Sequence, residues 1–325
     1  MNGRTLCVVG LGLIGGSLLR TAQRAGWKVH GTAVSPEDVQ AARQDGFEAT
    51  SVLEDALRAA ADSDALVVLA VPLPAVADVL SVVARHAPRC LLTDVVGVKR
   101  PVAKAVAQHL PLARYVGSHP MAGTSGSGWA AGSADLFEGA SWVVGTDEGA
   151  DLAVWAQVAR LVLDCGAQVV PADAADHDTA VARISHLPHL LAAVLASVGA
   201  DGGPLAMTLG AGSFSDGTRV AGSPPDLVRA MCEGNRGALL TAVDDALGRL
   251  GAARGSLAST GGLAATVRSG YLARRAFDAA RGDRPDRETV HVDLDAAGAL
   301  ERLREIGRAG GRVVALDGIR CQIEL

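Results

Sequence analysis

The sequence of 325 residues is poor in aromatic side chains, in paired cysteines and in long apolar runs. Phe, Trp and Tyr make up 3% of the chain against an apolar fraction of 49%, so its core must be built mainly from aliphatic side chains. The five cysteines are scattered and none has CxxC spacing, which favours a reducing compartment. We therefore expect a cytoplasmic protein.

Two further absences bear on the class of partner. The formal net charge of −5 offers no basic face to nucleic acid, and no uninterrupted apolar run reaches the roughly 18 residues of a membrane span. We expect neither a nucleic-acid nor a membrane partner. The first 20 residues have the basic and apolar outline of a signal peptide, but glycines interrupt the apolar run and no cleavage site follows.

Short apolar strands alternate with helical stretches through the first half of the chain. We expect strands at residues 5–10, 28–34, 65–72, 90–96, 141–146 and 167–172. One intervening helix begins with Ser35 as its N-cap and Pro36 at its first position. Apolar strands that alternate with helices predict a mostly parallel α/β sheet covered on both faces.

The first strand leads into VVGLGLIGGS, where Gly10, Gly12 and Gly15 have G-x-G-x-x-G spacing. Between a strand and a helix, this spacing permits a tight turn, the approach of a pyrophosphate and close helix packing. The amides at the start of the helix then face the phosphates. The motif predicts a nicotinamide dinucleotide site.

The sequence does not decide between NAD and NADP. The second strand lacks the usual acidic residue for the ribose, with Ala33 in its place, and no arginine immediately replaces it. The residues that we expect to contact the cofactor are Gly10, Gly12, Leu13, Ile14, Gly15, Thr32, Val71, Pro72 and Asp94.

The predicted secondary-structure pattern changes after about residue 172. Long helical patterns follow, and a charged segment at 281–288 precedes a strand, helix, strand, strand pattern. We predict a doubly wound Rossmann-type domain at 1–172, an all-helical domain at 173–283 and a small βαββ tail at 284–325 that docks elsewhere on the chain.

The segment GSHPMAGTSGSGW (117–129) places one of eight histidines among small polar residues. Its composition disfavours helix and strand, while Pro120 favours an extended backbone at His119. Oxidation of an alcohol by a nicotinamide needs a proton acceptor that titrates near neutrality, so His119 is the candidate base. Ordinary strand, helix or terminal settings surround His30, His86, His109 and His291.

The helical half offers three more candidates. In SHLPH, Ser185 and His189 lie four residues apart on one helix face, and Pro188 should kink that helix. No third ligand follows at a recognisable spacing, so we expect no metal site. Arg219, among glycines and serines, is either a carboxylate clamp or a surface arginine.

These motifs together resemble the prephenate/arogenate dehydrogenase family of tyrosine biosynthesis, in its actinobacterial form. The matching stretches include GLGLIGGSL, LTDVVGVK, GSHPMAGTSGSGW, SHLPHLLA and PDLVRAM, in the family's order over about residues 5–280. The resemblance implies oxidative decarboxylation of prephenate to 4-hydroxyphenylpyruvate, with hydride transfer to NAD or NADP. It also implies a homodimer formed through the helical domain.

The same resemblance assigns roles to single residues. It implies that His119 takes the proton of the ring hydroxyl, that Ser185 and His189 are catalytic, and that Arg219 binds a carboxylate of this prephenate-like dicarboxylate. It also places Thr124, Ser125 and Gly97 at the substrate. The chain departs from the family at Gly97, where a serine is usual, and at Ser125, where many members have glutamate.

Three alternatives accompany this interpretation. The substrate could be arogenate or a 4-amino analogue of prephenate. A hydroxyacid dehydrogenase of similar plan would want a catalytic lysine in the helical half, but the last lysine is Lys104. A dinucleotide sensor without catalysis is the third alternative.

Overall fold

The computed structural model describes residues 4–124, 126–282 and 287–325, and these form two compact units. The first unit comprises Met1–Asp178, Ser223–Gly234 and Thr289–Leu325, and the second comprises Thr179–Gly222 and Asn235–Glu288. The tail is therefore part of the first unit. The stretch Ser223–Gly234 also belongs there, although the sequence placed it with the helical domain.

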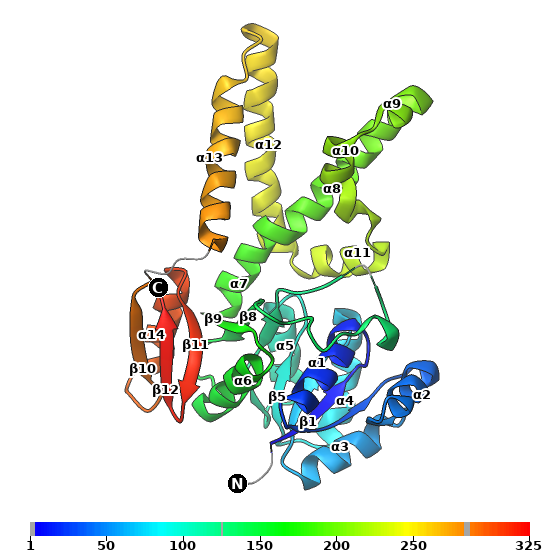
Figure 1. The fold of residues 1–325 in the computed structure, drawn as a ribbon, viewed down its shortest axis with the longest axis vertical. Helices are drawn as coiled ribbons and strands as arrows, with labels where there is room; N and C mark the ends of the chain where they lie inside the picture. The colour runs from blue at the N-terminus through cyan, green and yellow to red at the C-terminus, as the bar shows by residue number, and fades with distance from the viewer. Residues whose placement is uncertain (1–3, 125, 283–286) are drawn as a thin grey trace. The chain divides into compact units, whose positions relative to one another are not determined.

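The first unit contains a six-stranded sheet whose paired strands are all parallel (Figure 1). Its order is β3-β2-β1-β4-β5-β6, with bounds β1 Thr5–Val9, β2 Lys28–Thr32, β3 Glu48–Thr50, β4 Leu66–Leu69, β5 Leu91–Asp94 and β6 Arg114–Tyr115. The strand order reverses at β1 and β4, the position where open α/β sheets bind ligands beyond their carboxyl ends.

Five helices accompany these strands, and their boundaries follow local chemistry. They are α1 Leu13–Arg24, α2 Pro36–Gln44, α3 Leu53–Asp62, α4 Val76–His86 and α5 Arg100–His109. The predicted start of α2 is confirmed, because the Ser35 hydroxyl accepts a hydrogen bond from the Asp38 N–H at 3.0 Å. Strands β1 and β4 are almost completely buried, as two-sided coverage requires.

A second six-stranded sheet in the same unit has the order β10-β12-β11-β9-β8-β7. Its elements are β7 Ser118–Pro120, β8 Ser141–Gly145, β9 Gln168–Ala172, β10 Thr289–Asp293, β11 Arg312–Asp317 and β12 Arg320–Glu324, with helices α6 Leu152–Asp164 and α14 Ala299–Arg308. Only β8 and β9 are parallel; the other pairs are antiparallel. The strands expected at 141–146 and 167–172 therefore belong to a separate, mixed sheet.

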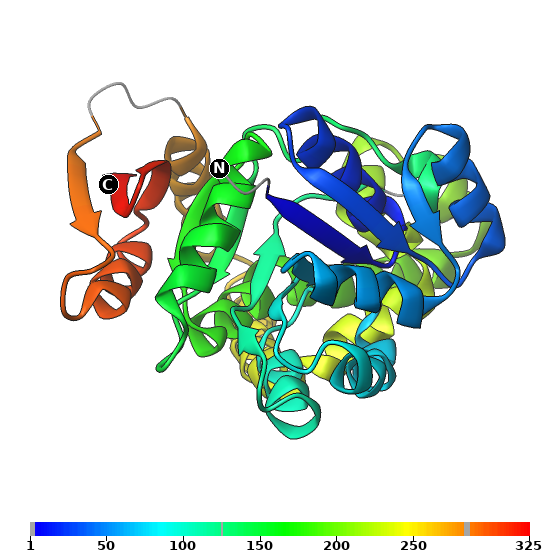
Figure 2. The same ribbon diagram turned by 90° about the horizontal axis from the view of Figure 1, so that it is seen from below.

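The tail completes this second sheet. Strand β11 pairs with β9 at Val313 and Val169, and Figure 2 shows the orange and red tail beside the green strands and α6. The expectation that the tail docks on the chain is confirmed. The expectation that 117–129 contains no strand is wrong, because His119 pairs with Val143 across β7 and β8.

The helical unit begins within one continuous helical stretch. Helix α7 (Ala174–Val181) passes through a π-helical turn, η3 (Ala182–His186), into α8 (Leu187–Asp201). By length and composition alone, the stretch Ala174–Asp201 could cross a membrane. One such helix is weak evidence for a membrane span, because core helices of other proteins pass the same test. The remaining helices are α9 Gly203–Leu209, α10 Gly212–Thr218, η4 Arg219–Gly222, α12 Arg236–Ser259 and α13 Ala264–Arg281, while α11 Pro225–Gly234 belongs to the first unit.

Candidate active site

The turn between β1 and α1 meets the geometric demands of a dinucleotide site. Gly10 has φ +104°, and a Cβ there would collide with the carbonyl of Ala70. A Cβ on Gly15 would collide with the Gly10 carbonyl, so close packing requires both glycines. A Cβ on Gly12 would meet nothing within 4 Å, which leaves the approach to the helix N-terminus open. The residues present therefore fit a bound pyrophosphate.

The other residues expected at the cofactor surround this turn. Leu13 and Ile14 form the first turn of α1, and the Thr32 carbonyl at the end of β2 accepts the Gly10 N–H at 2.8 Å. Val71 and Pro72 follow β4 after one intervening residue, Ala70. Beyond Thr32 come Ala33 and Val34 rather than an acidic residue, so the choice between NAD and NADP stays open.

Asp94 ends β5, and its carboxylate is buried in a polar cluster. It pairs with Lys99 Nζ and accepts hydrogen bonds from the Tyr115 hydroxyl at 2.7 Å and the Val96 N–H at 2.9 Å. Burial lowers the pKa of Lys99 against the attraction of Asp94, and burial together with Asp94 raises the pKa of Tyr115 well above its usual value. Contact between Asp94 and the cofactor stays a prediction; the structure shows its carboxylate engaged within the protein.

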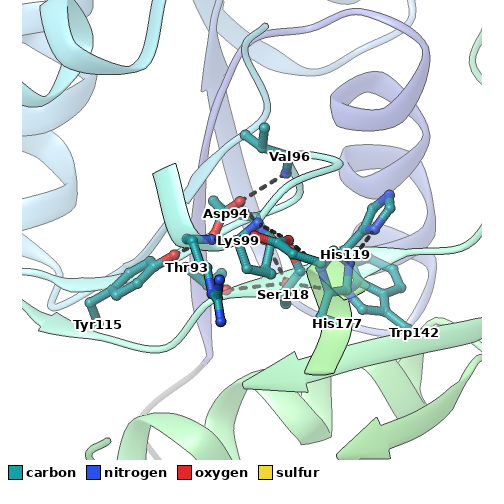
Figure 3. A network of polar contacts seen from close by, with 11 residues as sticks. Thr93, Asp94, Val96, Lys99, Tyr115, Ser118, His119, Trp142 and His177 are labelled. Carbon is teal, nitrogen blue, oxygen red and sulfur yellow. Dashed lines mark hydrogen bonds and ion pairs between the residues drawn. The ribbon is translucent and has the colours of Figure 1, made fainter. Parts of the chain in front are cut away.

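Ser118 connects this cluster to the second sheet, as Figure 3 shows. Its hydroxyl donates to the Asp94 carbonyl at 2.7 Å and accepts from Thr93 at 3.2 Å and from the Trp142 indole at 3.1 Å. Its carbonyl accepts from Lys99 Nζ. Because every bonding capacity of this buried hydroxyl is used, the backbone that carries the next residue, His119, is firmly held.

His119 is the first member of a chain of three side chains. Its Nδ1 lies 2.9 Å from His177 Nε2, and His177 Nδ1 lies 2.8 Å from Asp178 Oδ1 (Figure 3 shows the two histidines). Asp178 also accepts the backbone N–H groups of Lys99 and Arg100 at 2.8 and 2.9 Å, at the start of α5. His177 and Asp178 are only 2% and 1% exposed, so their hydrogen bond is shielded from water, while His119 is partly exposed.

The positions of the protons on the two histidines follow from Asp178, the acceptor at the end of this hydrogen-bond chain. Burial opposes ionisation of Asp178, but hydrogen bonds from His177 and from the two backbone N–H groups outweigh it and lower the pKa of Asp178. An ionised carboxylate only accepts, so His177 Nδ1 carries a hydrogen and its Nε2 accepts from His119 Nδ1. This assignment leaves the basic lone pair of His119 on Nε2.

That nitrogen faces Gly97. A Cβ on Gly97 would lie 3.7 Å from His119 Nε2, an ordinary contact distance. The missing side chain therefore widens the space beside the candidate base. Thr124 is exposed in the following loop, where its hydroxyl accepts the Gly126 N–H at 3.2 Å, and Ser125 lies outside the described residues.

Sequence reasoning missed His177 and Asp178. The pair lies near the start of α7, which follows β9 and runs on to SHLPH, so an adjacent His and Asp close to a strand-to-helix junction was the available signal. The roles of Lys99 and Tyr115 were also missed, since nothing in the local pattern reveals a buried ion pair.

The remaining predicted site residues lie in the helical unit. Ser185 belongs to the π-helical turn, and its carbonyl accepts from His189 Nδ1 at 2.8 Å, which confirms that the two share a helix face. Pro188 is accommodated just after this turn, at the second position of α8. Arg219 is exposed at the start of η4 and makes no ion pair among residues 4–124, 126–282 and 287–325. The roles of these residues stay predictions.

The doubly wound sheet, the glycine turn and the hydrogen-bonded pair of His119 and His177 define a dehydrogenase that uses a nicotinamide dinucleotide. Residues 18–171 match the family model "Prephenate dehydrogenase, nucleotide-binding domain", and residues 173–260 match "Prephenate dehydrogenase, dimerization domain". The chain belongs to the prephenate dehydrogenase family.

Individual relatives agree with this assignment. Prephenate dehydrogenase of Bacillus subtilis is 31% identical over 74% of this chain and 67% of its own length. Cyclohexadienyl dehydrogenase of Zymomonas mobilis is 32% identical over 79% of this chain and 89% of its own length. The crystal structure of a candidate prephenate dehydrogenase from Corynebacterium glutamicum superposes with a TM-score of 0.89 at 42% identity, covering 96% of this chain and 99% of that one. This likeness extends into the C-terminal tail.

Proposed function

We propose that the chain oxidatively decarboxylates prephenate with NAD or NADP and that His119 Nε2 is the proton acceptor. The observation that carries the proposal is the hydrogen-bond chain from Asp178 through His177 to His119. It sets the tautomer of His119 and provides a negative charge that stabilises the imidazolium formed during the reaction. The match to the family and its relatives supplies the substrate.

The protein's part in the reaction is to orient the ring hydroxyl and move its proton. A bound nicotinamide would supply the acceptor for the hydride of the ring carbon that bears this hydroxyl. His119 Nε2 takes the hydroxyl proton as hydride leaves, and the electron pair of the breaking bond to the ring carboxylate makes the ring aromatic as carbon dioxide departs. The proton then returns from His119 to the phenolate oxygen.

Arogenate or a 4-amino analogue of prephenate is the second candidate substrate. Gly97 leaves space beside His119 Nε2, at a position where the resemblance implies a serine, and this space favours the 4-amino analogue, whose ring substituent differs from that of prephenate. Arogenate keeps the ring hydroxyl and differs from prephenate in its side chain, so this space does not bear on it. One relative is named cyclohexadienyl dehydrogenase. The choice therefore depends on measured turnover.

The test is a spectrophotometric assay of cofactor reduction. Prephenate, arogenate and the 4-amino analogue are each paired with NAD and with NADP, using wild type, His119→Ala and the exposed-histidine control His291→Ala. We expect reduction with prephenate, a kcat lower by about 10²–10⁴ in His119→Ala, and no change in the control. Absence of reduction with every pair would overturn the enzyme assignment, and full turnover by His119→Ala would overturn the role of His119.

Arg219 is the proposed carboxylate clamp, supported by its exposed guanidinium and by the resemblance. We expect Arg219→Ala to raise KM for prephenate by about tenfold to a hundredfold while KM for the dinucleotide is unchanged. Arg219→Lys should recover only part of the affinity, because an ammonium lacks the paired N–H groups. An unchanged KM in Arg219→Ala would rule out the clamp.

We further propose that the chain forms a homodimer through its helical unit, in the cytoplasm. Apolar side chains are exposed along α8, α12 and α13, more than an isolated domain should present. They include Val194, Leu195, Val198, Leu247, Leu250, Leu257, Val267, Tyr271, Leu272 and Phe277. No disulfide joins the described cysteines, which fits a reducing compartment. Sedimentation at the mass of one chain would contradict the dimer.

A further inference from the structure

The C-terminal helix α14 packs against the strand that leads to the candidate base network. Its Leu303 and Ile306 are buried in the main core cluster. A Cβ on Gly307 would collide with the carbonyl of Pro171 in β9, so only glycine permits this approach of the two backbones. Helix α14 is therefore fitted to β9 at van der Waals distance and not tethered loosely to the surface.

Two arginines of α14 reach past this contact to the start of α7. Arg308 Nε lies 2.6 Å from Asp176 Oδ2, and Arg308 Nη2 lies 3.3 Å from Asp173 Oδ2. Arg304 Nε lies 3.1 Å from the Thr146 carbonyl and 3.6 Å from Asp173 Oδ2. The Arg304 and Asp173 side chains are only 22% and 15% exposed, which limits solvent screening of their attraction.

The carboxylate that these arginines hold is also the N-cap of α7. Asp173 Oδ1 accepts the Asp176 N–H at 2.8 Å, while its Oδ2 faces the two arginines. The Asp173 carbonyl accepts the His177 N–H at 3.0 Å. One side chain therefore joins the tail to the first turn of α7.

His177 lies in that first turn of α7, and Asp178 follows it directly. The bond between His177 Nε2 and His119 Nδ1 is 2.9 Å long, and its geometry depends on where the first turn of α7 places the His177 ring. A displacement of about 1 Å at such a contact can cost a hundredfold in rate. Any shift of Asp173 or Asp176 would be transmitted to His177 within one helical turn.

We propose that Arg304 and Arg308 of the C-terminal tail are positioning residues for the reaction, because they fix the first turn of α7 and thereby the His177 ring that orients His119. The proposal rests on the proposed role of His119 as proton acceptor. It makes the tail a structural part of the catalytic apparatus of this chain.

The test compares Arg304→Gln, Arg308→Gln and their double variant with Arg302→Gln. Arg302 lies on the same helix, and within residues 4–124, 126–282 and 287–325 its one ion pair is with the exposed Glu305, one turn away, so it is a matched control. We expect kcat of the double variant to fall by about tenfold to a hundredfold, with KM for prephenate and dinucleotide nearly unchanged. Arg308→Lys should recover part of kcat. Unchanged kcat in the double variant, or an equal loss in Arg302→Gln, would overturn the proposal.

Two further measurements separate positioning from loss of fold. In a double-mutant cycle, Arg308→Gln and Asp176→Asn should not be additive in kcat, since both break the same pair. The downfield proton resonance of the His177 N–H bonded to Asp178 should broaden or shift in the arginine variants and persist in Arg302→Gln. Additive effects on kcat, or an unchanged resonance with reduced kcat, would contradict a path through His177.

The background variant His119→Ala distinguishes this proposal from the proposed function. If the arginines act through His119, Arg304→Gln with Arg308→Gln should lower the residual kcat of His119→Ala no further. Full turnover by His119→Ala would refute the role of that histidine, and the proposal that rests on it. An impaired His119→Ala beside an unimpaired arginine double variant would leave the role of His119 standing and overturn only the positioning role of the tail.

Discussion

The two sheets of the first unit are assembled in different ways. The parallel sheet is built from consecutive strand–helix units, so each strand finds its neighbour after one crossover or across the β1–β4 reversal. The second sheet combines β7, β8 and β9 with three strands that follow more than one hundred residues later. The first sheet carries the dinucleotide turn, while the second carries His119 and the strand before His177.

This difference means that the site depends on how the two sheets are joined. A buried junction runs from Asp94 at the end of β5 through Lys99 to Ser118 in β7. An exposed junction pairs Arg114 of β6 with Asp151, the N-cap of α6, at 2.6 and 2.8 Å. Both are ionic, but their burial differs, and burial determines how much each should stabilise the fold.

The largest effect is expected from breaking the buried junction with Lys99→Met. This change leaves the Asp94 carboxylate buried without its cationic partner, which should lower the free energy of unfolding by about 3–5 kcal/mol. Urea denaturation followed by circular dichroism measures it. The double variant Lys99→Met with Asp94→Asn should recover part of the loss, because the uncompensated charge is gone. A loss below about 1 kcal/mol in Lys99→Met would show that the junction is not what couples the sheets.

The contrast between the locally assembled parallel sheet and the second sheet, which distant strands complete, also explains what the sequence could predict. The glycine turn, Ser35 at the N-cap of α2 and the main strands of the parallel sheet follow from local spacing, and they were predicted to within a few residues. The tail pattern was also predicted, because its strand–helix–strand–strand periodicity is local. Its pairing partner β9 was not, since sequence periodicity carries no information about which distant edge a strand completes.

The candidate site shows the same limit. His119 could be singled out because Pro120 and the loop composition are local features, whereas its contact with His177 joins residues 58 positions apart. The short strand β7 was missed because its pairing with β8 overrides the composition of the segment. The cluster around Asp94 was missed because a buried ion pair looks like ordinary surface charge in a sequence.

A second prediction tests the parallel sheet by itself, with two glycines of one turn. Gly15→Ala should lower the free energy of unfolding by about 1–3 kcal/mol, because its methyl group would collide with the Gly10 carbonyl. Gly12→Ala should leave stability within about 0.5 kcal/mol, since its methyl group meets no protein atom within 4 Å. It should nevertheless raise the Kd for the dinucleotide by at least about tenfold, because the pyrophosphate would have to approach that position.

Denaturant titration and fluorescence titration with NAD and NADP measure the two effects separately. The outcome that contradicts the interpretation is a parallel loss: if Gly12→Ala destabilises the fold as much as Gly15→Ala does, the open face at Gly12 is not reserved for a ligand.

The smallest effect is expected at the exposed junction, with Asp151→Asn. Asparagine keeps the N-cap of α6 but loses the charge that pairs with Arg114, so the free energy of unfolding should fall by less than about 1 kcal/mol at neutral pH. The hydrogen bond from Arg114 is the main cause that lowers the pKa of Asp151 from 3.8 to about 2. The stabilisation is therefore complete above the unfolded pKa and is lost as the pH falls toward the folded one.

The pH dependence of the unfolding free energy tests this prediction. The difference in unfolding free energy between wild type and Asp151→Asn should be constant between about pH 7 and pH 5 and should shrink below about pH 4. Asp151→Ala, which also removes the cap, should be less stable than Asp151→Asn by about 1 kcal/mol, and that second difference should persist in acid because the asparagine cap does not titrate. A difference between wild type and Asp151→Asn that grows as the pH falls would mean that the charge of Asp151 opposes folding, and that the exposed junction, unlike the buried one, does not hold the two sheets together.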